Sequence, residues 1–218
     1  MNPSASSEAR WKIHGLRSFV EEENKKKHCL PFIAITETWL KGYITDAQIK
    51  IPNYNVSRSD RGKRTGGGVL LYSHTDIPLS SYSKFDDGTC EVVFCRFDTK
   101  KTSFAVVYRP PKTPFFSFKN AMTFVENAIK DIGDDSYQHC VTGDFNFPLI
   151  DWSTGVTKSG GTTEDATSSN MLLKFMSDHI SIFKLLHVAI TSLNFSFAIV
   201  AVWLQMSPPI LQLSQITA

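Results

Sequence analysis

The stretch CEVVFCRFDTKKTSFAVVYRPP, residues 90–111, decides the fold class. Two runs rich in Val, Phe and Cys, residues 90–97 and 103–108, flank the polar turn at residues 98–101, a pattern that is typical of a β-hairpin. Pro110 and Pro111 end the second run, because proline cannot donate a hydrogen bond to a strand ladder. We therefore expect a hairpin in the middle of the chain.

Helices and strands alternate irregularly on both sides of this hairpin. Apolar residues recur at helical spacing in two segments, and three short apolar runs have the composition of buried strands. The expected helices are residues 11–27 and 116–132, and the expected strands are 32–35, 69–72 and 138–142. This order favours a mixed-sheet α/β sandwich over a doubly wound parallel sheet.

Composition sets broad limits on the class of protein. The chain has 218 residues, 42% of them apolar, and a formal net charge of +2, so it is neither disordered throughout nor a strongly basic nucleic-acid binder. The four cysteines, Cys29, Cys90, Cys95 and Cys140, form no CxxC pair. We expect reduced thiols in an intracellular protein, nuclear or cytoplasmic. Cys90 and Cys95 are five apart, so they face opposite sides of a strand and do not pair.

The sequence divides into three parts. Residues 1–10 are small and polar and are expected to be disordered, and residues 11–184 carry the α/β pattern. Residues 185–218 contain no Asp, Glu, Lys or Arg. If helical, residues 185–206 would be about 33 Å long, enough to cross a bilayer. This tail has two interpretations. It is a membrane helix, or it is read-through from an intron or a frameshift.

Three segments place polar side chains directly after predicted strands. Glu37 follows the first strand, Tyr108 and Arg109 close the hairpin, and Asp144 and Asn146 end the strand at 138–142. Strand ends hold polar groups at a common rim, and residues two apart on an extended chain point to the same side. Glu37 could bind magnesium, and Asp144 could orient or deprotonate a water.

The remaining polar groups suit a phosphodiester substrate. Asn146 and Tyr108 could donate hydrogen bonds to phosphate oxygens, and Arg109 could offset their charge. Tyr108 could equally be a core aromatic residue whose hydroxyl reaches the rim. The loop before the strand at 69–72 is basic and could contact a DNA backbone, or be a solvated loop; its residues are Arg58, Arg61, Lys63 and Arg64. Gly66–Gly68 precede a strand and lack the Lys-Ser/Thr of a P-loop.

The segments ITETWL (35–40), GGGVLLY (66–72), YRPP (108–111) and GDFN (143–146), in this order, resemble the endonuclease domain of LINE-like, non-LTR retrotransposons. That domain belongs to the endonuclease/exonuclease/phosphatase family, whose fold is a four-layered α/β sandwich of the DNase I-like type. The resemblance covers residues 32–179. It implies that Glu37 binds Mg²⁺ or Mn²⁺, that Asp144 and Asn146 act on the water and the phosphate, and that Tyr108 contacts the phosphate.

The chain departs from the family pattern at both ends of the domain. A helix is predicted where the family has a first strand ending in Asn. The later strands that carry a further Asp and an Asp-His pair are absent, so the resemblance implies an incomplete, truncated sandwich. Ser177-Asp178-His179 imitates the pair but lies in a helical pattern, and a surface position in a helix is the favoured interpretation.

Three functions therefore remain open. The first is an enzyme that nicks DNA by magnesium-dependent phosphodiester hydrolysis, with no small-molecule cofactor and membrane contact only through residues 185–206. The second is a phosphoesterase of the same fold that acts on a lipid or small phosphate ester. The third is a non-enzymatic remnant.

Overall fold

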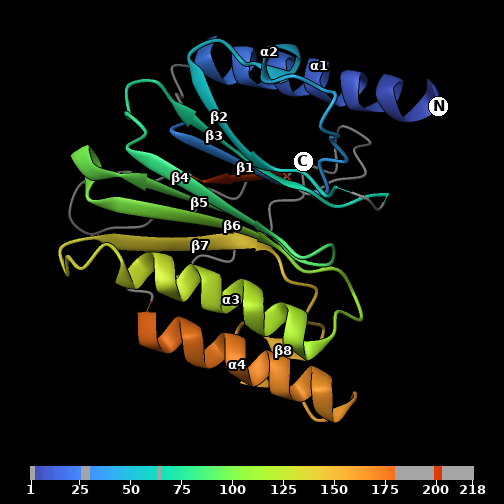
Figure 1. The fold of residues 1–218 in the computed structure, drawn as a ribbon, viewed down its shortest axis with the longest axis vertical. Helices are drawn as coiled ribbons and strands as arrows, with labels where there is room; N and C mark the ends of the chain where they lie inside the picture. Colours follow the sequence, from blue (N-terminus) through green and yellow to red (C-terminus); the bar gives the residue numbers. More distant parts are fainter. Residues whose placement is uncertain (1–2, 26–29, 63–64, 180–198, 203–218) are drawn as a thin grey trace.

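The computed structural model describes residues 3–25, 30–62, 65–179 and 199–202 (Figure 1). Two four-stranded sheets face each other at its centre, with helices on both outer sides. Sheet A has the strand order β10-β1-β3-β2, and sheet B has the order β4-β5-β6-β7. The layers are therefore helix, sheet, sheet and helix, which confirms the predicted four-layered α/β sandwich.

Sheet A is antiparallel throughout. Its strands are β1 (Phe32–Thr36), β2 (Tyr54–Ser59), β3 (Val69–His74) and β10 (Ile199–Val202). All five residues of β1 are buried, because helices cover one face of the sheet and sheet B covers the other. A strand buried on both faces reads as a continuous apolar run, and this is why Phe32-Ile33-Ala34-Ile35 could be recognised in the sequence.

Sheet B contains the predicted hairpin. Its strands are β4 (Ser81–Asp86), β5 (Glu91–Phe97), β6 (Thr102–Tyr108) and β7 (Gln138–Asp144). The turn between β5 and β6 is a short 3-10 helix, η1 (Asp98–Lys100), which Lys101 ends in a left-handed conformation. β6 and β7 pair in parallel and the other pairs are antiparallel, so the sheet is mixed as expected.

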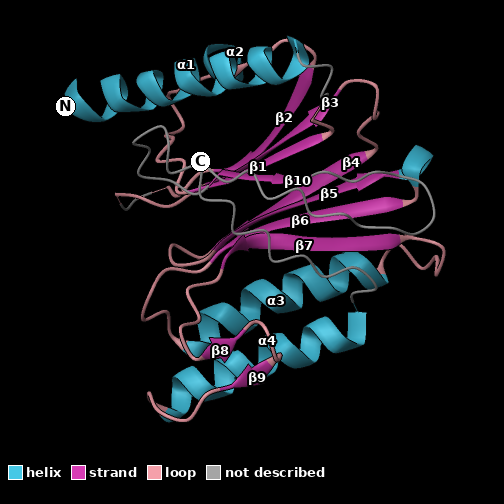
Figure 2. Cartoon of the chain, turned by 180° about the vertical axis from the view of Figure 1, so that it is seen from behind, coloured by secondary structure: helices cyan, strands magenta, loops and turns pink. Residues whose placement is uncertain are grey.

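The helices form the two outer layers. They are α1 (Pro3–Lys25), α2 (Asp46–Ile49), α3 (Phe115–Lys130) and α4 (Thr163–His179). α1 and α2 lie over sheet A, whereas α3 lies beneath sheet B with α4 beside it (Figure 1). α1 begins at Pro3 and so includes most of the ten residues for which the sequence predicts disorder. A small hairpin of β8 (Ile150–Asp151) and β9 (Val156–Thr157) adjoins α4 (Figure 2).

Apolar side chains fill the three spaces between the layers, and alternation along the strands assigns each residue to one space. On β6, Phe104, Val106 and Tyr108 point between the sheets, while Ala105 and Val107 point towards α3. Leu16 and Val20 of α1 pack on sheet A. This packing holds the layers against one another, and the strand ends that carry the loops are held in place with the layers.

The cysteines agree with the sequence analysis. Cys90 packs in the helix-side core and Cys95 in the inter-sheet core, so they face opposite sides of β5, and both are unpaired. Cys140 is also buried and unpaired. Burial raises the pKa of all three thiols to about 12, so they behave as inert core residues.

Most of the uncharged tail lies outside the described residues, and with it most of the segment 185–206 considered as a membrane helix. Residues 199–202 of that segment form β10, which pairs antiparallel with β1. None of the helices that the structure describes combines the length and the apolarity needed to cross a membrane.

Candidate active site

Three polar side chains adjoin one another at one edge of sheet B. Glu91 opens β5, Tyr108 closes β6 and Asp144 closes β7. Tyr108 pairs in register with Glu91 on one side and with Asp144 on the other. Paired residues share a face of the sheet, so all three point into the space between the sheets, as Tyr108 does. The strand ends therefore meet at a common rim, as the sequence predicts for Tyr108 and Asp144.

Sheet A brings Glu37 to the same rim. Glu37 follows β1, and its Oε1 accepts a hydrogen bond from the hydroxyl of Tyr108. Its Oε2 accepts hydrogen bonds from Nε1 of Trp39, at 2.6 Å, and from the backbone N–H of Gly67, at 3.3 Å. Glu37 and Trp39 both have positive φ, 57° and 54°. A left-handed conformation at two non-glycine residues stores strain, and such strain concentrates at functional sites.

Tyr108 holds the Glu37 carboxylate in place. Burial, followed by the hydrogen bond to Glu37, raises the pKa of Tyr108 far above its usual range, so the phenol stays protonated at neutral pH. A phenol has one hydrogen to donate, and Tyr108 gives it to Glu37. The geometry therefore favours a positioning role for Tyr108 over the predicted hydrogen bond to phosphate.

A buried ion pair between Arg61 and Glu91 lies beside Tyr108. Arg61 is 8% exposed and Glu91 is fully buried, and the guanidinium contacts both oxygens of the Glu91 carboxylate. Arg61 also donates to the Thr89 carbonyl, at 2.6 Å, and lies 5.5 Å from the ring centre of Tyr108. Burial raises the pKa of Glu91, and the contact with Arg61 opposes that rise. Arg61 thus joins the loop after β2 to the rim, instead of pointing to solvent as a DNA contact.

The glycine-rich loop passes directly over Arg61. Gly67 has a φ of +71°, and a Cβ there would come within 2.4 Å of the Arg61 guanidinium carbon. The neighbouring Gly68 N–H donates to Glu91 at 3.3 Å. Glycine is therefore required for close approach: the loop's N–H groups hold the carboxylates of Glu37 and Glu91.

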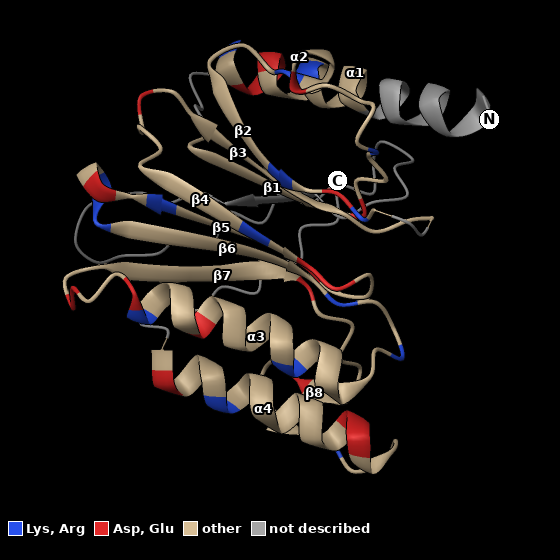
Figure 3. Ribbon diagram, in the orientation of Figure 1, with Lys and Arg blue, Asp and Glu red and all other residues tan. Residues whose placement is uncertain are grey.

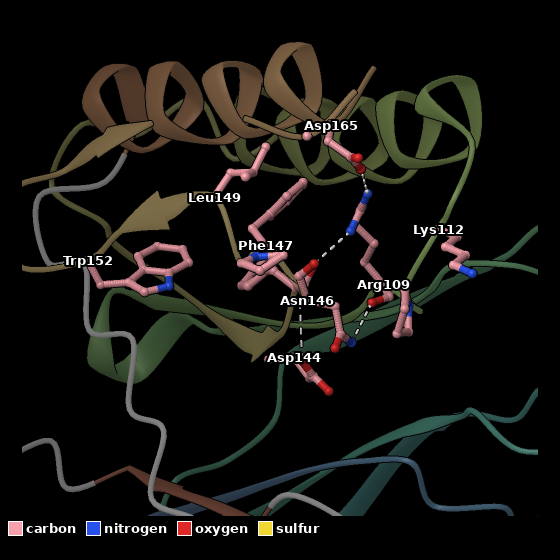
Figure 4. Close-up of a pocket in the computed structure, with 13 residues that line it drawn as sticks. Arg109, Lys112, Asp144, Asn146, Phe147, Leu149, Trp152 and Asp165 are labelled. Atoms are coloured by element: carbon pink, nitrogen blue, oxygen red, sulfur yellow. Dashed lines mark hydrogen bonds and ion pairs between the residues drawn. The ribbon is translucent and has the colours of Figure 1, made fainter. Parts of the chain in front are cut away.

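Asp144 and Asn146 line one pocket, but not for the reason predicted. The sequence analysis assumes an extended chain, whereas Asn146 has a φ of 49° and lies in a turn. Its backbone N–H donates to Oδ1 of Asp144 at 3.2 Å, and its side-chain amide donates to the Arg109 carbonyl at 2.9 Å. Both residues line the pocket shown in Figure 4.

Arg109 lies inside the protein. It is 1% exposed, and its guanidinium donates to the carbonyls of Phe145, at 3.2 Å, and Asn146, at 3.1 Å. The same group lies 4.1 Å from the ring centre of Phe147. This geometry corrects the prediction that Arg109 contacts DNA: the side chain fixes the GDFN turn and has no exposed surface to offer a phosphate.

The other residues predicted to contact DNA either form ion pairs within the protein or lie outside the described residues. Arg58 forms ion pairs with Asp46, at 3.0 Å, and with Asp60, at 3.6 Å. Lys63 and Arg64 lie outside the described residues. Along the coloured elements of Figure 3, acidic and basic residues are interspersed.

The triplet Ser177-Asp178-His179 belongs to the last turn of α4, as the sequence indicates. Asp178 pairs with Lys174 of the same helix at 2.7 Å, and His179 lies 3.6 Å from Glu126 of α3. The first contact lies within α4 and the second joins α4 to α3, so both assign the triplet to the helical layer instead of the rim.

The donor set at the rim is compatible with magnesium. Among the described residues, no cluster of three or more His, Cys, Asp or Glu side chains could hold a metal ion. Magnesium needs fewer, because it is bound by one or two carboxylates and keeps several waters. The Glu37 carboxylate accepts three hydrogen bonds. A carboxylate has about four acceptor positions, so one position remains for a cation.

Sequence reasoning missed Arg61 and Glu91 as a pair, and Trp39 as a donor to Glu37. One signal was available for the pair: Glu91 opens an otherwise apolar strand, and a carboxylate buried there needs a cation. No comparable signal marked Trp39, because its indole reaches Glu37 through a left-handed turn that local sequence does not specify.

No protein-family model matches the chain, and no curated protein matches it. Among solved structures, the chain is similar to a humanised D. rerio TDP2 carrying 14 mutations, with 10% sequence identity and a TM-score of 0.40. The match covers 66% of this chain and 58% of that chain, so the chain spans less than two thirds of that protein's length. A likeness at this level does not bear on function, which rests on the geometry of the rim.

Proposed function

We propose that the chain is a metal-dependent phosphodiesterase that cleaves one strand of DNA. One observation carries this proposal: Glu37, Tyr108 and Asp144 come from three strands in two sheets and converge on one rim. Asn146 adjoins them across the GDFN turn. Two carboxylates beside an amide donor can supply a base for water and a hydrogen bond to the phosphate, which suits hydrolysis of a phosphate diester.

We assign the activation of water to Asp144. In the proposed reaction its carboxylate takes a proton from a water molecule as the water oxygen attacks phosphorus. The phosphorus–oxygen bond to the leaving sugar breaks, and the departing oxygen takes a proton from solvent. The Asn146 amide has a second N–H beyond the one given to Arg109, and this N–H donates to the phosphate as charge builds up there.

Lys112 takes the charge-balancing role that the sequence assigned to Arg109. Lys112 is exposed, and it lines the same pocket as Asp144 and Asn146. A cation at this place offsets the charge of the phosphate without having to leave a buried site. Glu37 would hold Mg²⁺ or Mn²⁺, which when bound stabilises the negative charge on the phosphate oxygens.

The DNA substrate and a LINE-like origin are supported by the four resembling segments, of which three supply the residues of the rim. ITETWL gives Glu37 and Trp39, YRPP gives Tyr108, and GDFN gives Asp144 and Asn146. GGGVLLY gives Gly67, whose N–H binds Glu37. A phosphoesterase acting on a lipid or small phosphate ester would share this rim and differ in the surrounding loops.

The test is metal-dependent turnover on three substrates by the purified chain. Supercoiled plasmid, p-nitrophenyl phosphate and a phosphoinositide vesicle are each incubated with magnesium and with a chelator. We expect the plasmid to be nicked in magnesium but not in the chelator. We expect no phosphate to be released from p-nitrophenyl phosphate or from the phosphoinositide. Hydrolysis of a monoester without nicking would overturn the DNA substrate. No reaction from a sample with a folded circular dichroism spectrum would overturn the enzyme itself.

A further inference from the structure

A pocket of about 580 Å³ opens next to Asp144 and Asn146 (Figure 4). It lies between the segment that follows β7 and the start of α4, where Asp165 forms part of its wall. In the view of Figure 4, Trp152 and Lys112 stand on opposite sides of Asp144 and Asn146. Pockets of roughly 300–1,000 Å³ hold small ring compounds, so this one is large enough for a nucleobase.

The pocket has a fixed aromatic floor. Phe147 is 6% exposed, and its ring lies 4.1 Å from the Arg109 guanidinium and 5.1 Å from the ring of Phe118. These contacts hold Phe147 from two sides. Asn146 and Asp144 are joined to the same turn by hydrogen bonds. The Phe147 ring is therefore held at a fixed position relative to the proposed catalytic groups.

Trp152 forms the accessible part of the wall. Its residue surface is 37% exposed, so part of the indole can be reached from solvent. Trp152 comes directly after β8, whose Ile150 is buried in the helix-side core, so the backbone that carries the indole is anchored. An anchored and partly exposed indole offers a flat surface on which a planar ring can stack.

We propose that this pocket binds a nucleobase of the DNA strand next to the phosphate at Asp144, with the base stacked on Trp152. Three observations support this occupant: the pocket shares Asp144 and Asn146 with the rim, its lining includes the rings of Phe147 and Trp152, and Lys112 lines it as a cation for the adjoining phosphate. The inference rests on the proposed function, because it takes the cleaved strand to be DNA. Stacking does not read the base identity, so the pocket positions the strand instead of selecting a sequence.

The test is binding in the presence of a chelator, so that no turnover occurs. Fluorescein-labelled dT6 and a labelled chain of six abasic deoxyribose phosphates are titrated with the full chain and followed by fluorescence anisotropy. Both probes carry the same phosphates, so their difference reports the bases. Stacking on one aromatic residue contributes roughly 1–3 kcal/mol, so we expect dT6 to bind on the order of 5–150 times more tightly than the abasic chain.

Variants assign that difference to the pocket. Trp152→Leu should bring dT6 to within about threefold of the abasic chain, whereas Trp152→Phe should keep most of the difference because phenylalanine also stacks. Tyr82→Leu removes another exposed ring, on β4, and should change nothing. Equal binding of the two probes by the unaltered chain, no saturable binding of dT6, or an unchanged difference in Trp152→Leu would each overturn the inference.

The outcome is independent of nicking. Base-dependent binding that requires Trp152, from a chain that does not nick plasmid, would leave the pocket standing and remove the catalytic proposal. Magnesium-dependent nicking without any contribution of the bases to binding would do the reverse.

Discussion

The hydroxyl of Tyr108 donates a hydrogen bond to the carboxylate of Glu37, and this contact joins the two sheets at their common rim. Tyr108 is the last residue of β6 in sheet B, and Glu37 is the first residue after β1 in sheet A. A catalytic rim that spans two sheets depends on such polar links, and the contacts of Arg61 and of the Gly68 N–H with Glu91 are two others between the same sheets.

Removing that hydroxyl should affect activity more than stability. Tyr108→Phe keeps the ring in the inter-sheet core but leaves Glu37 with one donor fewer. We expect metal-dependent nicking to fall roughly 10–100-fold, as is typical when a partner of a metal-binding group is lost. The free energy of unfolding should fall by only about 1 kcal/mol. Plasmid nicking and urea unfolding measure the two effects, with Tyr82→Phe as control. A loss of stability without a loss of activity would contradict the positioning role.

Arg61 should stabilise the fold, because its removal leaves Glu91 buried without a cation. Arg61→Ala should lower the free energy of unfolding by about 3–5 kcal/mol. The double variant Arg61→Met with Glu91→Gln should lose less than the two single variants together, since no charge then remains buried. Urea unfolding of the unaltered chain, Arg61→Met, Glu91→Gln and the double variant gives the coupling energy. If Arg61 were a DNA contact, stability would hold and the salt slope of DNA binding would fall by about one.

Gly143 should tolerate no side chain. A Cβ there would come within 1.8 Å of the Val107 carbonyl on the neighbouring strand, and the φ of Gly143 is +142°. Gly143→Ala should therefore cost on the order of 3–5 kcal/mol of stability. Gly155 also has positive φ, +67°, but faces open space, so Gly155→Ala should cost about 1–2 kcal/mol. Equal losses in the two variants, measured by thermal unfolding, would show that the close approach to Val107 is not what selects glycine.

Acidification should destabilise the protein through His139. Burial, with a smaller contribution from His179, lowers the pKa of His139 below the ordinary value of 6.5. The unfolded chain then takes up a proton first as the pH falls below about 6.5, so stability present at neutral pH is lost towards the lower folded pKa. The urea midpoint should be lower at pH 5.5 than at pH 7.5. The difference should shrink in His139→Gln; the same difference in both proteins would assign it to other groups.

The layers and most strands could be predicted because burial leaves a local pattern. β1 and β6 are covered on both faces and read as apolar runs, and Phe118, Met122, Val125 and Ile129 mark the buried face of α3. β4 could not be found in this way. Its residues are mostly exposed, and Ser81–Asp86 shows no apolar run.

The site could be predicted only where a residue ends a strand. Tyr108 and Asp144 meet because β6 and β7 are parallel neighbours, so their ends coincide. The sequence did not reveal which groups the arginines contact. Arg61 and Arg109 are of a residue type that often contacts phosphate, yet tertiary packing buries both. Arg61 lies against Glu91, and Arg109 lies against the carbonyls of the GDFN turn. A guanidinium has the same donors in either setting, so its role depends on burial, which residue type alone does not reveal.

The most direct test of the central claim compares plasmid nicking by Glu37→Gln and Asp144→Asn with nicking by the unaltered chain, in magnesium. Two matched controls, Glu21→Gln on the exposed side of α1 and Asp135→Asn in the loop before β7, make the same chemical changes away from the rim. We predict that both rim variants lose nicking at least 100-fold while both controls keep it, with all proteins folded. Nicking that survives in either rim variant would contradict the rim as the catalytic site.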